Sequence, residues 1–156
     1  MRLGRTMLMA LAFSAVALAA DQSAAEKELL KIENEWFQAY FHSDAATMNR
    51  IEGEDCVVIT GSPNVKNELE PRQKNCNFSS RSEATKTRLA SMKRSLEHTQ
   101  VRFMGDIAIV NGLNVETGQD ASGVTHTGKA YYTSVWVKRN STWQIVNVQF
   151  TDAPKP

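Results

Sequence analysis

The chain has 156 residues, a formal net charge of +1, and 42% hydrophobic against 22% charged residues. This length is sufficient for one domain with a hydrophobic core of its own. Because no basic tract lies outside the N-terminal segment, nucleic acid and anionic membrane surfaces are not expected partners.

The N-terminus has the layout of a secretory signal peptide. Two arginines precede an apolar run over 7–18, and small residues lead to a cleavage point near Ala19 or Ala20. The run is shorter than the roughly 20 apolar residues of a membrane-spanning helix, which makes a membrane anchor the weaker alternative. We therefore expect removal of residues 1–20 and a secreted or periplasmic chain that has no membrane association afterwards.

The first helix of the mature chain is predicted to begin at Ser23, which has capping-box spacing to Glu26. An apolar arc at helical spacing follows, made of Leu29, Leu30, Ile32, Trp36, Phe37, Tyr40 and Phe41. Glu33 lies inside this arc, where a carboxylate either reaches solvent at an edge or faces a cavity. Trp36 and Tyr40 share that side of the helix, as core residues or as the wall of a pocket.

Shorter elements are predicted in the middle of the chain. Residues 45–51 indicate a short helix with Asp44 as its N-cap, and the β-branched run 56–60 indicates a strand. Residues 62–78 are polar, contain two prolines and are typical of a loop. A second capping box predicts a third helix over 80–94, beginning with Ser80.

The remainder predicts an antiparallel meander whose strands cover residues 96–104, 107–117, 127–138 and 142–151. Gly105-Asp106 fits a tight hairpin with glycine at the first central position. Residues 152–156, with two prolines, are expected to form a loose tail. Helices followed by a meander indicate one α+β domain over 21–151, with the helices covering one face of a curved sheet.

Cys56 and Cys76 are the two cysteines of the chain, and they bracket the predicted loop. Exported proteins meet oxidising conditions, in which such a pair usually forms a disulfide. A zinc site needs about four closely spaced ligands, whereas the three histidines are scattered and lie far from both cysteines. We expect a structural Cys56–Cys76 disulfide, with no metal and no cofactor. The alternatives are two free thiols, or a metal or redox role.

Two segments together resemble a known superfamily. They are EWFQAYFHSDAATMNRI, and MGDIAIVNG followed by YYTSVWVKRNSTWQIVNVQF. Their order and spacing are similar to the nuclear-transport-factor-2-like superfamily, above all to its SnoaL-like branch and the family called domain of unknown function 4440. The resemblance covers about residues 26–61 and 95–151.

This resemblance implies a cone-shaped, curved antiparallel sheet wrapped around a long N-terminal helix, with two further short helices. It also implies a pocket at the wide end of the cone and a homodimer formed through the sheet. The superfamily includes ketosteroid isomerase, cyclases, dehydratases and binding modules, so the fold does not decide the function.

Candidate chemistry is sparse. In ketosteroid isomerases a general-base aspartate lies near the end of the first strand, but residues 59–63 here contain no carboxylate, so that reaction is not expected. Glu33 on the helix could instead form an acid–base pair with His98 or Tyr40 across a cavity. His98 lies in an alternating strand and faces either that cavity or solvent.

The last strand is predicted to place Trp143, Ile145, Asn147, Gln149 and Thr151 on one face, and Gln144, Val146, Val148 and Phe150 on the other. Because both faces are largely apolar, one is expected to line the cavity and the other to meet a dimer partner. Asn147, Gln149 and the mid-strand Asn111 need polar partners if they are buried, such as a ligand, a water molecule or Tyr132.

The sequence therefore predicts an exported homodimer that binds a small, largely apolar ligand between the first helix and the sheet. The expected pocket residues are Glu33, Trp36, Tyr40, His98, Asn111, Tyr132, Asn147 and Gln149. Two alternatives stay open: an isomerase, cyclase or lyase that uses Glu33 with His98 or Tyr40, and a non-catalytic protein-interaction module. The residues name neither a ligand nor a reaction.

Overall fold

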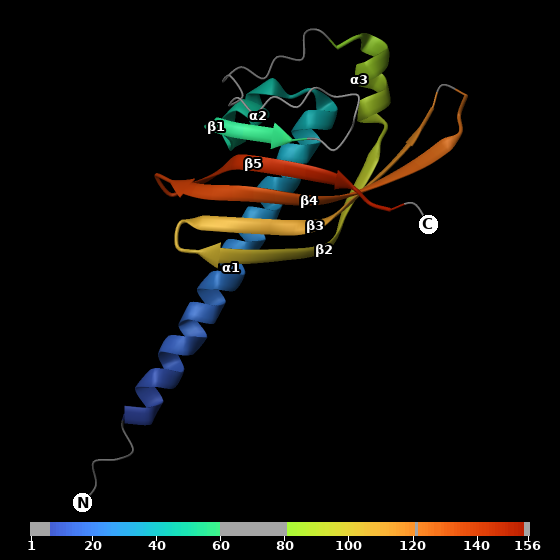
Figure 1. The fold of residues 1–156 in the computed structure, drawn as a ribbon. Coiled ribbons are helices and arrows are strands. Elements are labelled where there is room, and N and C mark those ends of the chain that lie inside the picture. The colour runs from blue at the N-terminus through green and yellow to red at the C-terminus, as the bar shows by residue number, and fades with distance from the viewer. Residues whose placement is uncertain (1–6, 60–80, 121, 155–156) are drawn as a thin grey trace, which may run out of the picture. The chain divides into compact units, whose positions relative to one another are not determined.

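The computed structural model describes residues 7–59, 81–120 and 122–154, and within 7–22 only the helical backbone (Figure 1). The chain divides into two units, Met1–Asn34 and Glu35–Pro156, each of which is considered by itself. The described elements are, in chain order, α1 (Met7–His42), α2 (Ala45–Ile51), β1 (Glu52–Ile59), α3 (Glu83–Ala90), β2 (Lys93–Met104), β3 (Ile107–Gln119), β4 (Thr125–Arg139) and β5 (Thr142–Asp152). These elements confirm the predicted α+β class.

α1 is continuous from Met7 and contains no glycine or proline. The predicted helix start at Ser23 is wrong, because an N-cap must lie where the chain enters the helix and residues 7–22 are already helical. Among the described residues, no helix is both long and apolar enough to cross a membrane. Removal of residues 1–20 stays a prediction.

The two short helices begin at polar caps. The Asp44 carboxylate accepts hydrogen bonds from the Thr47 amide at 3.1 Å and the Thr47 hydroxyl at 2.7 Å, which confirms the predicted N-cap of α2. For α3 the cap is Ser82, whose hydroxyl accepts from the Thr85 amide at 3.2 Å. Ser80, predicted for this role, lies outside the described residues.

α3 is also shorter than expected, because it ends at Ala90 whereas the sequence predicted a helix to residue 94. Lys93 and Arg94 instead begin β2, where they pair with Thr117 and Glu116 of β3. Pairing with a strand that follows later in the chain overrides the local helix preference at these two positions.

The described strands form one five-stranded sheet in the order β1-β5-β4-β3-β2 (Figure 1). Neighbours from β2 to β5 are antiparallel, as the meander predicts. The sheet is nevertheless mixed, because β1 runs parallel to β5. The sequence specified no partner for this edge strand, and its parallel pairing joins segments from opposite ends of the domain.

Both tight connections of the meander have left-handed backbone at the turn. Gly105 has φ of +63° between β2 and β3, which confirms the predicted hairpin. Asn140 and Ser141 have φ of +50° and +64° between β4 and β5, as a two-residue type I′ connection requires. These turns set the register of β2 with β3 and of β4 with β5.

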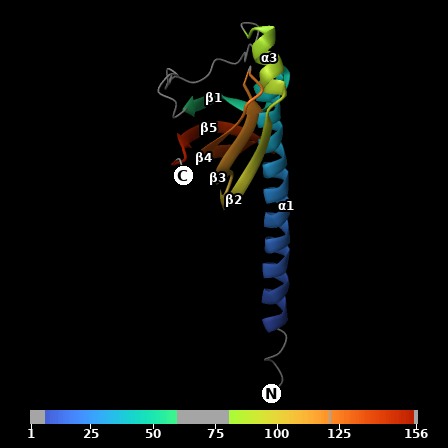
Figure 2. The same cartoon turned by 90° about the vertical axis from the view of Figure 1, so that its right-hand side faces the viewer.

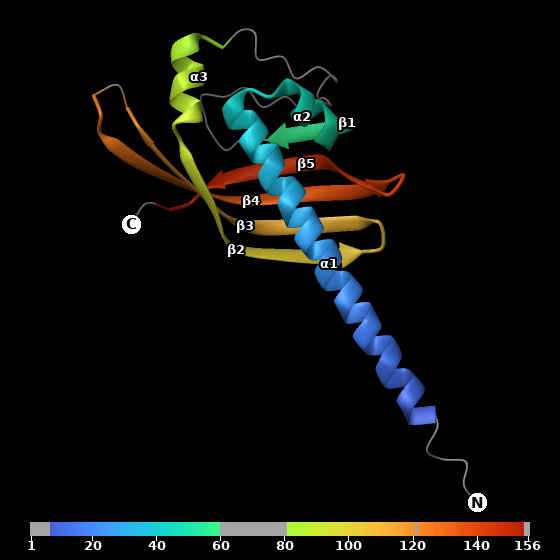
Figure 3. The same cartoon turned by 180° about the vertical axis from the view of Figure 1, so that it is seen from behind.

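From Glu35 onward, α1 belongs to the second unit and lies on one face of the sheet, as the view from behind shows (Figure 3). The Phe37 ring meets the rings of Tyr132 and Phe150 edge-on, each at a centroid distance of 6.0 Å. The buried side chains of the strands on this face are Ala108, Val110, Tyr132, Trp136, Trp143, Ile145 and Val148. This face therefore contains the hydrophobic core of the second unit.

A β-bulge in β5 changes which side chains share a face. Trp136 pairs with Ile145 and Val135 with Asn147, so Val146 has no partner on β4. As a result Ile145 and Val148 lie on the same, helix-covered face, and both are fully buried. The strict alternation predicted for the last strand is wrong beyond this point, because one extra residue reverses the face of every residue that follows.

Candidate functional site

Within the described part of the second unit, the opposite face of the sheet has no helix over it (Figure 2). We call this surface the open face. Strand register and alternation place on it the side chains of Val57, Ile59, Ser95, Glu97, Gln100, Arg102, Met104, Ile107, Ile109, Asn111, Leu113, Val115, Lys129, Tyr131, Thr133, Val135, Val137, Gln144, Asn147, Gln149 and Thr151.

The open face is largely apolar. Ile109 pairs with Val135 at its centre, between β3 and β4. Three large apolar side chains are strongly exposed, with Met104 at 56%, Ile107 at 41% and Tyr131 at 56%. Large apolar side chains that are exposed together on one face are typical of a site of interaction.

One polar row crosses this apolar surface. Gln100 pairs with Asn111, Asn111 with Thr133, and Thr133 with Gln149, so the row runs across four neighbouring strands. We call these four residues the polar row. The Asn111 amide donates to the Thr133 hydroxyl at 2.8 Å, and Arg102 donates to the Asn111 carbonyl oxygen at 3.2 Å.

Two of the predicted pocket residues are part of the core on the other face. Trp36 is buried, and its indole nitrogen donates to the Glu52 carboxylate at 3.0 Å. Tyr132 is 2% exposed and packs against Phe37. Trp36 thus has the surroundings of a core residue, whereas Tyr132 is a core residue that also borders a hollow.

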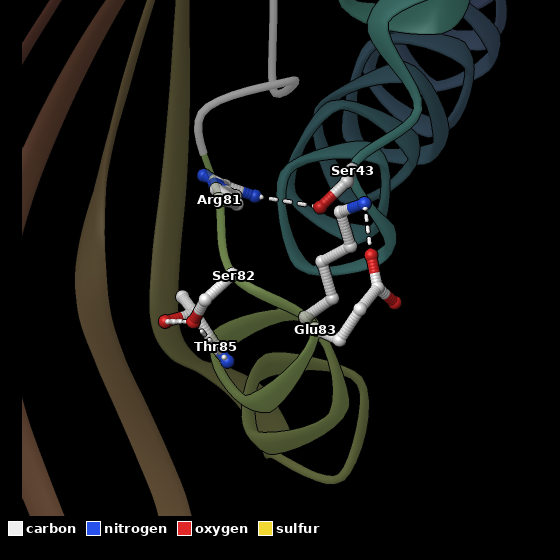
Figure 4. A network of polar contacts seen from close by, with 6 residues as sticks. Ser43, Arg81, Ser82, Glu83 and Thr85 are labelled. Carbon is white, nitrogen blue, oxygen red and sulfur yellow. Dashed lines mark hydrogen bonds and ion pairs between the residues drawn. The ribbon is translucent and has the colours of Figure 1, made fainter.

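Tyr40 lies at the C-terminal end of α1 and is 38% exposed. The Arg81 guanidinium stacks on its ring at 4.4 Å from the centroid. Arg81 also donates to the Tyr40 carbonyl at 2.7 Å and to the Ser43 hydroxyl at 3.0 Å, and Figure 4 shows the second of these bonds beside the Ser82 cap of α3. Arg81 thus holds the end of α1 next to the beginning of α3.

His98 lies at an irregularity of β2, with φ of +53°, where the register with β3 shifts between Glu97 and Gln100. It borders a hollow of about 480 Å³ together with two other predicted pocket residues, Asn111 and Tyr132. Asn147 and Gln149 belong to the same face. His98 is exposed, and of its two expected orientations it adopts the one towards solvent.

The structure therefore brings three of the predicted pocket residues, His98, Asn111 and Tyr132, to one hollow, but it does not bring the whole set together. Trp36 lies on the helix-covered face, whereas the amides Asn111, Asn147 and Gln149 belong to the open face. Glu33 belongs to the first unit, where its side chain is fully buried.

Comparison with known families matches residues 25–154 to the family model of the calcium/calmodulin dependent protein kinase II association domain. The chain belongs to this family. No protein with a curated description matches it.

Solved structures agree on the fold of this association domain. The calcium/calmodulin dependent protein kinase II hub of S. rosetta is 21% identical, with a TM-score of 0.62, over 81% of this chain and 95% of that one. The association domain of the C. elegans kinase is 17% identical, with a TM-score of 0.66, over 84% and 98%. A nuclear transport factor 2-like protein of Salmonella enterica is 15% identical, with a TM-score of 0.65, over 86% and 94%.

The predicted fold is thereby confirmed, since the chain has the fold of a nuclear transport factor 2-like protein. The narrower assignment to the SnoaL-like branch and domain of unknown function 4440 is not supported, because the family that matches is a different one. The motifs quoted from the sequence lie in the helix–strand framework that these branches share, so they could not distinguish between them.

The association domain has a polar cluster that the sequence did not reveal, where β3 joins β4. The Asp120 carboxylate accepts from the Ser122 amide at 2.9 Å, the Ser122 hydroxyl at 2.6 Å and the Val124 amide at 3.0 Å, and it lies 2.8 Å from the His126 ring. These contacts, with the Ser122 hydroxyl the strongest, hold the pKa of Asp120 well below its usual range. The Asp-x-Ser-Gly spacing is the signal that could have predicted this turn.

A second cluster joins the edge strand β1 of the association domain to the end of the central strand β4. Arg139 donates to both carboxylate oxygens of Asp55, at 2.9 and 2.7 Å. The hydrogen bonds lower the pKa of Asp55 and raise that of Arg139. No group of three or more potential metal ligands occurs among the described residues. Cys56 is buried on β1, but Cys76 lies outside the described residues, so their disulfide stays a prediction.

Proposed function

We propose that this chain is a self-association module that joins copies of itself through the open face of its sheet. The observation that carries the proposal is the apolar open face, with Met104, Ile107 and Tyr131 strongly exposed. Membership of an association-domain family supports it, as does the hub structure of a relative. The protein-interaction alternative is thus favoured over a ligand pocket, whose expected residues are divided between two faces.

The size of the open face suits such an interface. β3 has 13 residues, and strands rise about 3.4 Å per residue and lie about 4.8 Å apart. Five strands therefore offer an area comparable with the roughly 800 Å² that each partner buries in a stable interface. Burial of a large apolar side chain contributes about 1.5–3 kcal/mol. Because association itself costs roughly 4–15 kcal/mol, many side chains of the open face must be buried together for stable self-association.

Sedimentation velocity of the purified protein at micromolar concentration tests this proposal. We expect an oligomer for the wild type and a monomer for Tyr131→Glu, because a carboxylate buried in an apolar interface is strongly unfavourable. The control is Val124→Glu, which changes a residue of similar exposure, 52%, outside the open face. A monomeric wild type, or equal behaviour of both variants, would contradict the proposal.

We also propose that the chain is exported, on the strength of the N-terminal signature alone. Arg2 and Arg5, the apolar run and the small residues before Asp21 support it. Intact mass measurement of the protein recovered from its host tests the cleavage near Ala19 or Ala20. A full-length N-terminus in the recovered protein would contradict export by this route.

A further inference from the structure

We infer that the polar row of Gln100, Asn111, Thr133 and Gln149 fixes the register in which two copies of the sheet pack face to face. This inference rests on the proposed function, and it names the residues that make the association specific. The rows on either side are apolar at the centre of the sheet: Ile109 and Val135 on one side, Leu113 and Tyr131 on the other.

The polar row has hydrogen-bonding capacity that one copy does not use. Asn111 donates to Thr133 and accepts from Arg102, which leaves one amide N–H of Asn111 and the hydroxyl hydrogen of Thr133 available. At the two ends of the row, Gln100 and Gln149 make no side-chain hydrogen bond within the described part of the chain. These groups are hydrated in a single copy and would lose water in an interface.

The need to pair these polar groups when they lose water determines the register of the two sheets. When the polar row faces a polar row, each amide can exchange hydrogen bonds with its counterpart. A slip of one row moves a sheet by two residues, about 6.6 Å, and places the amides against Ile109 and Val135. Each amide then buried without a partner weakens that register by about tenfold or more. Polar residues in an otherwise apolar interface specify coiled-coil register by the same physics.

A second copy is the occupant that this surface fits. A side-chain amide both donates and accepts, so a row of amides complements itself, as the two-fold symmetry of a homodimer demands. Arg102 and Glu97 flank the polar row on β2, one on each side of it. A two-fold axis along the row places Arg102 opposite Glu97 of the partner subunit, which makes the charges of the face self-complementary as well.

The test uses a double variant, Asn111→Leu with Gln149→Leu, and a spin label carried by a non-natural amino acid at position 124, outside the open face. Native mass spectrometry reports whether copies associate, and pulsed electron paramagnetic resonance reports the distance between labels. We expect one narrow distance for the wild type. For the double variant we expect association that is as tight or tighter, with two or more distances.

The matched control replaces polar residues of the open face outside the polar row, Gln144→Leu with Thr151→Leu, and should keep the single distance. Gln149→Leu alone serves if the double variant does not fold, because Gln149 is exposed and makes no side-chain hydrogen bond within the described residues. A single, wild-type distance in the row variants would overturn the inference and leave self-association intact. A monomeric wild type would overturn the proposed function itself.

Discussion

At the scale of single residues, the best-defined local device is the Asp120 turn. One exposed carboxylate accepts hydrogen bonds from two backbone amides and a hydroxyl, and so reinforces the backbone turn between β3 and β4, in which the Gly123 amide donates to the Asp120 carbonyl at 3.0 Å. Hydrogen bonds to the charged form lower its pKa, which means that the folded turn binds a proton less readily than the unfolded chain does. The turn is therefore stabilised wherever this carboxylate is ionised.

This predicts an acid-sensitive turn. The contribution of Asp120 is fully present above the ordinary aspartate pKa of about 3.9, and it decreases as the pH falls below that value. Asp120→Ala should increase hydrogen exchange at the Ser122 and Val124 amides at neutral pH, while the control Asp152→Ala should not. Equal exchange in both variants, measured by nuclear magnetic resonance, would contradict the role of Asp120.

At this scale, the features that involve only residues close in sequence were the easiest to predict. The Asp44 cap and the Gly105 turn involve neighbours within a few positions, and both are present. The bidentate Asp55–Arg139 pair could not be predicted, because it joins residues that are 84 positions apart.

At the scale of elements, β3 packs so closely on the core at Gly112 that little room is left for a side chain. A Cβ at Gly112 would lie 2.8 Å from Cε1 of Tyr132 and 3.2 Å from Oγ1 of Thr99. Tyr132 is buried and packs on Phe37, so its ring has little room to move. The glycine thus allows β3 and β4 to carry a large aromatic side chain beneath the helix.

Gly112→Ala should therefore destabilise the fold by about 1–3 kcal/mol, the usual effect of overpacking. Gly128→Ala is the matched control on the neighbouring strand, because a Cβ there meets nothing within 4 Å. Thermal unfolding at one fixed protein concentration measures both. An unfolding temperature for Gly112→Ala equal to that of the control would contradict this prediction, because it would show that the core accommodates the added methyl group.

Two features at this scale, the direction of β1 relative to β5 and the bulge in β5, could not be predicted from the sequence. β1 is parallel to β5 although the chain between them contributes the rest of the sheet, and nothing in a β-branched run specifies the direction of its partner. The bulge at Val146 depends on the match between β4 and β5, and it reverses the faces of Asn147 and Gln149.

At the scale of the whole molecule, self-association links stability to concentration. A partner that binds the folded chain and not the unfolded one stabilises it by mass action. The thermal midpoint of the wild type should therefore rise with protein concentration over the micromolar range. The Tyr131→Glu variant should show a lower midpoint that does not depend on concentration, as calorimetry at several concentrations can establish.

The residues by themselves determined the α+β class, the positions of most strands, the cap of α2 and the first hairpin, because each depends on periodicity or on neighbours in sequence. Only the tertiary structure decided which sheet face is covered and how the polar residues are divided between faces. The physical reason is that strand periodicity assigns side chains to two faces without saying which one is buried. In this chain that choice is made by the packing of Phe37 on Tyr132 and Phe150 and by one bulge in β5, and it leaves His98, Asn111 and Gln149 on the open face.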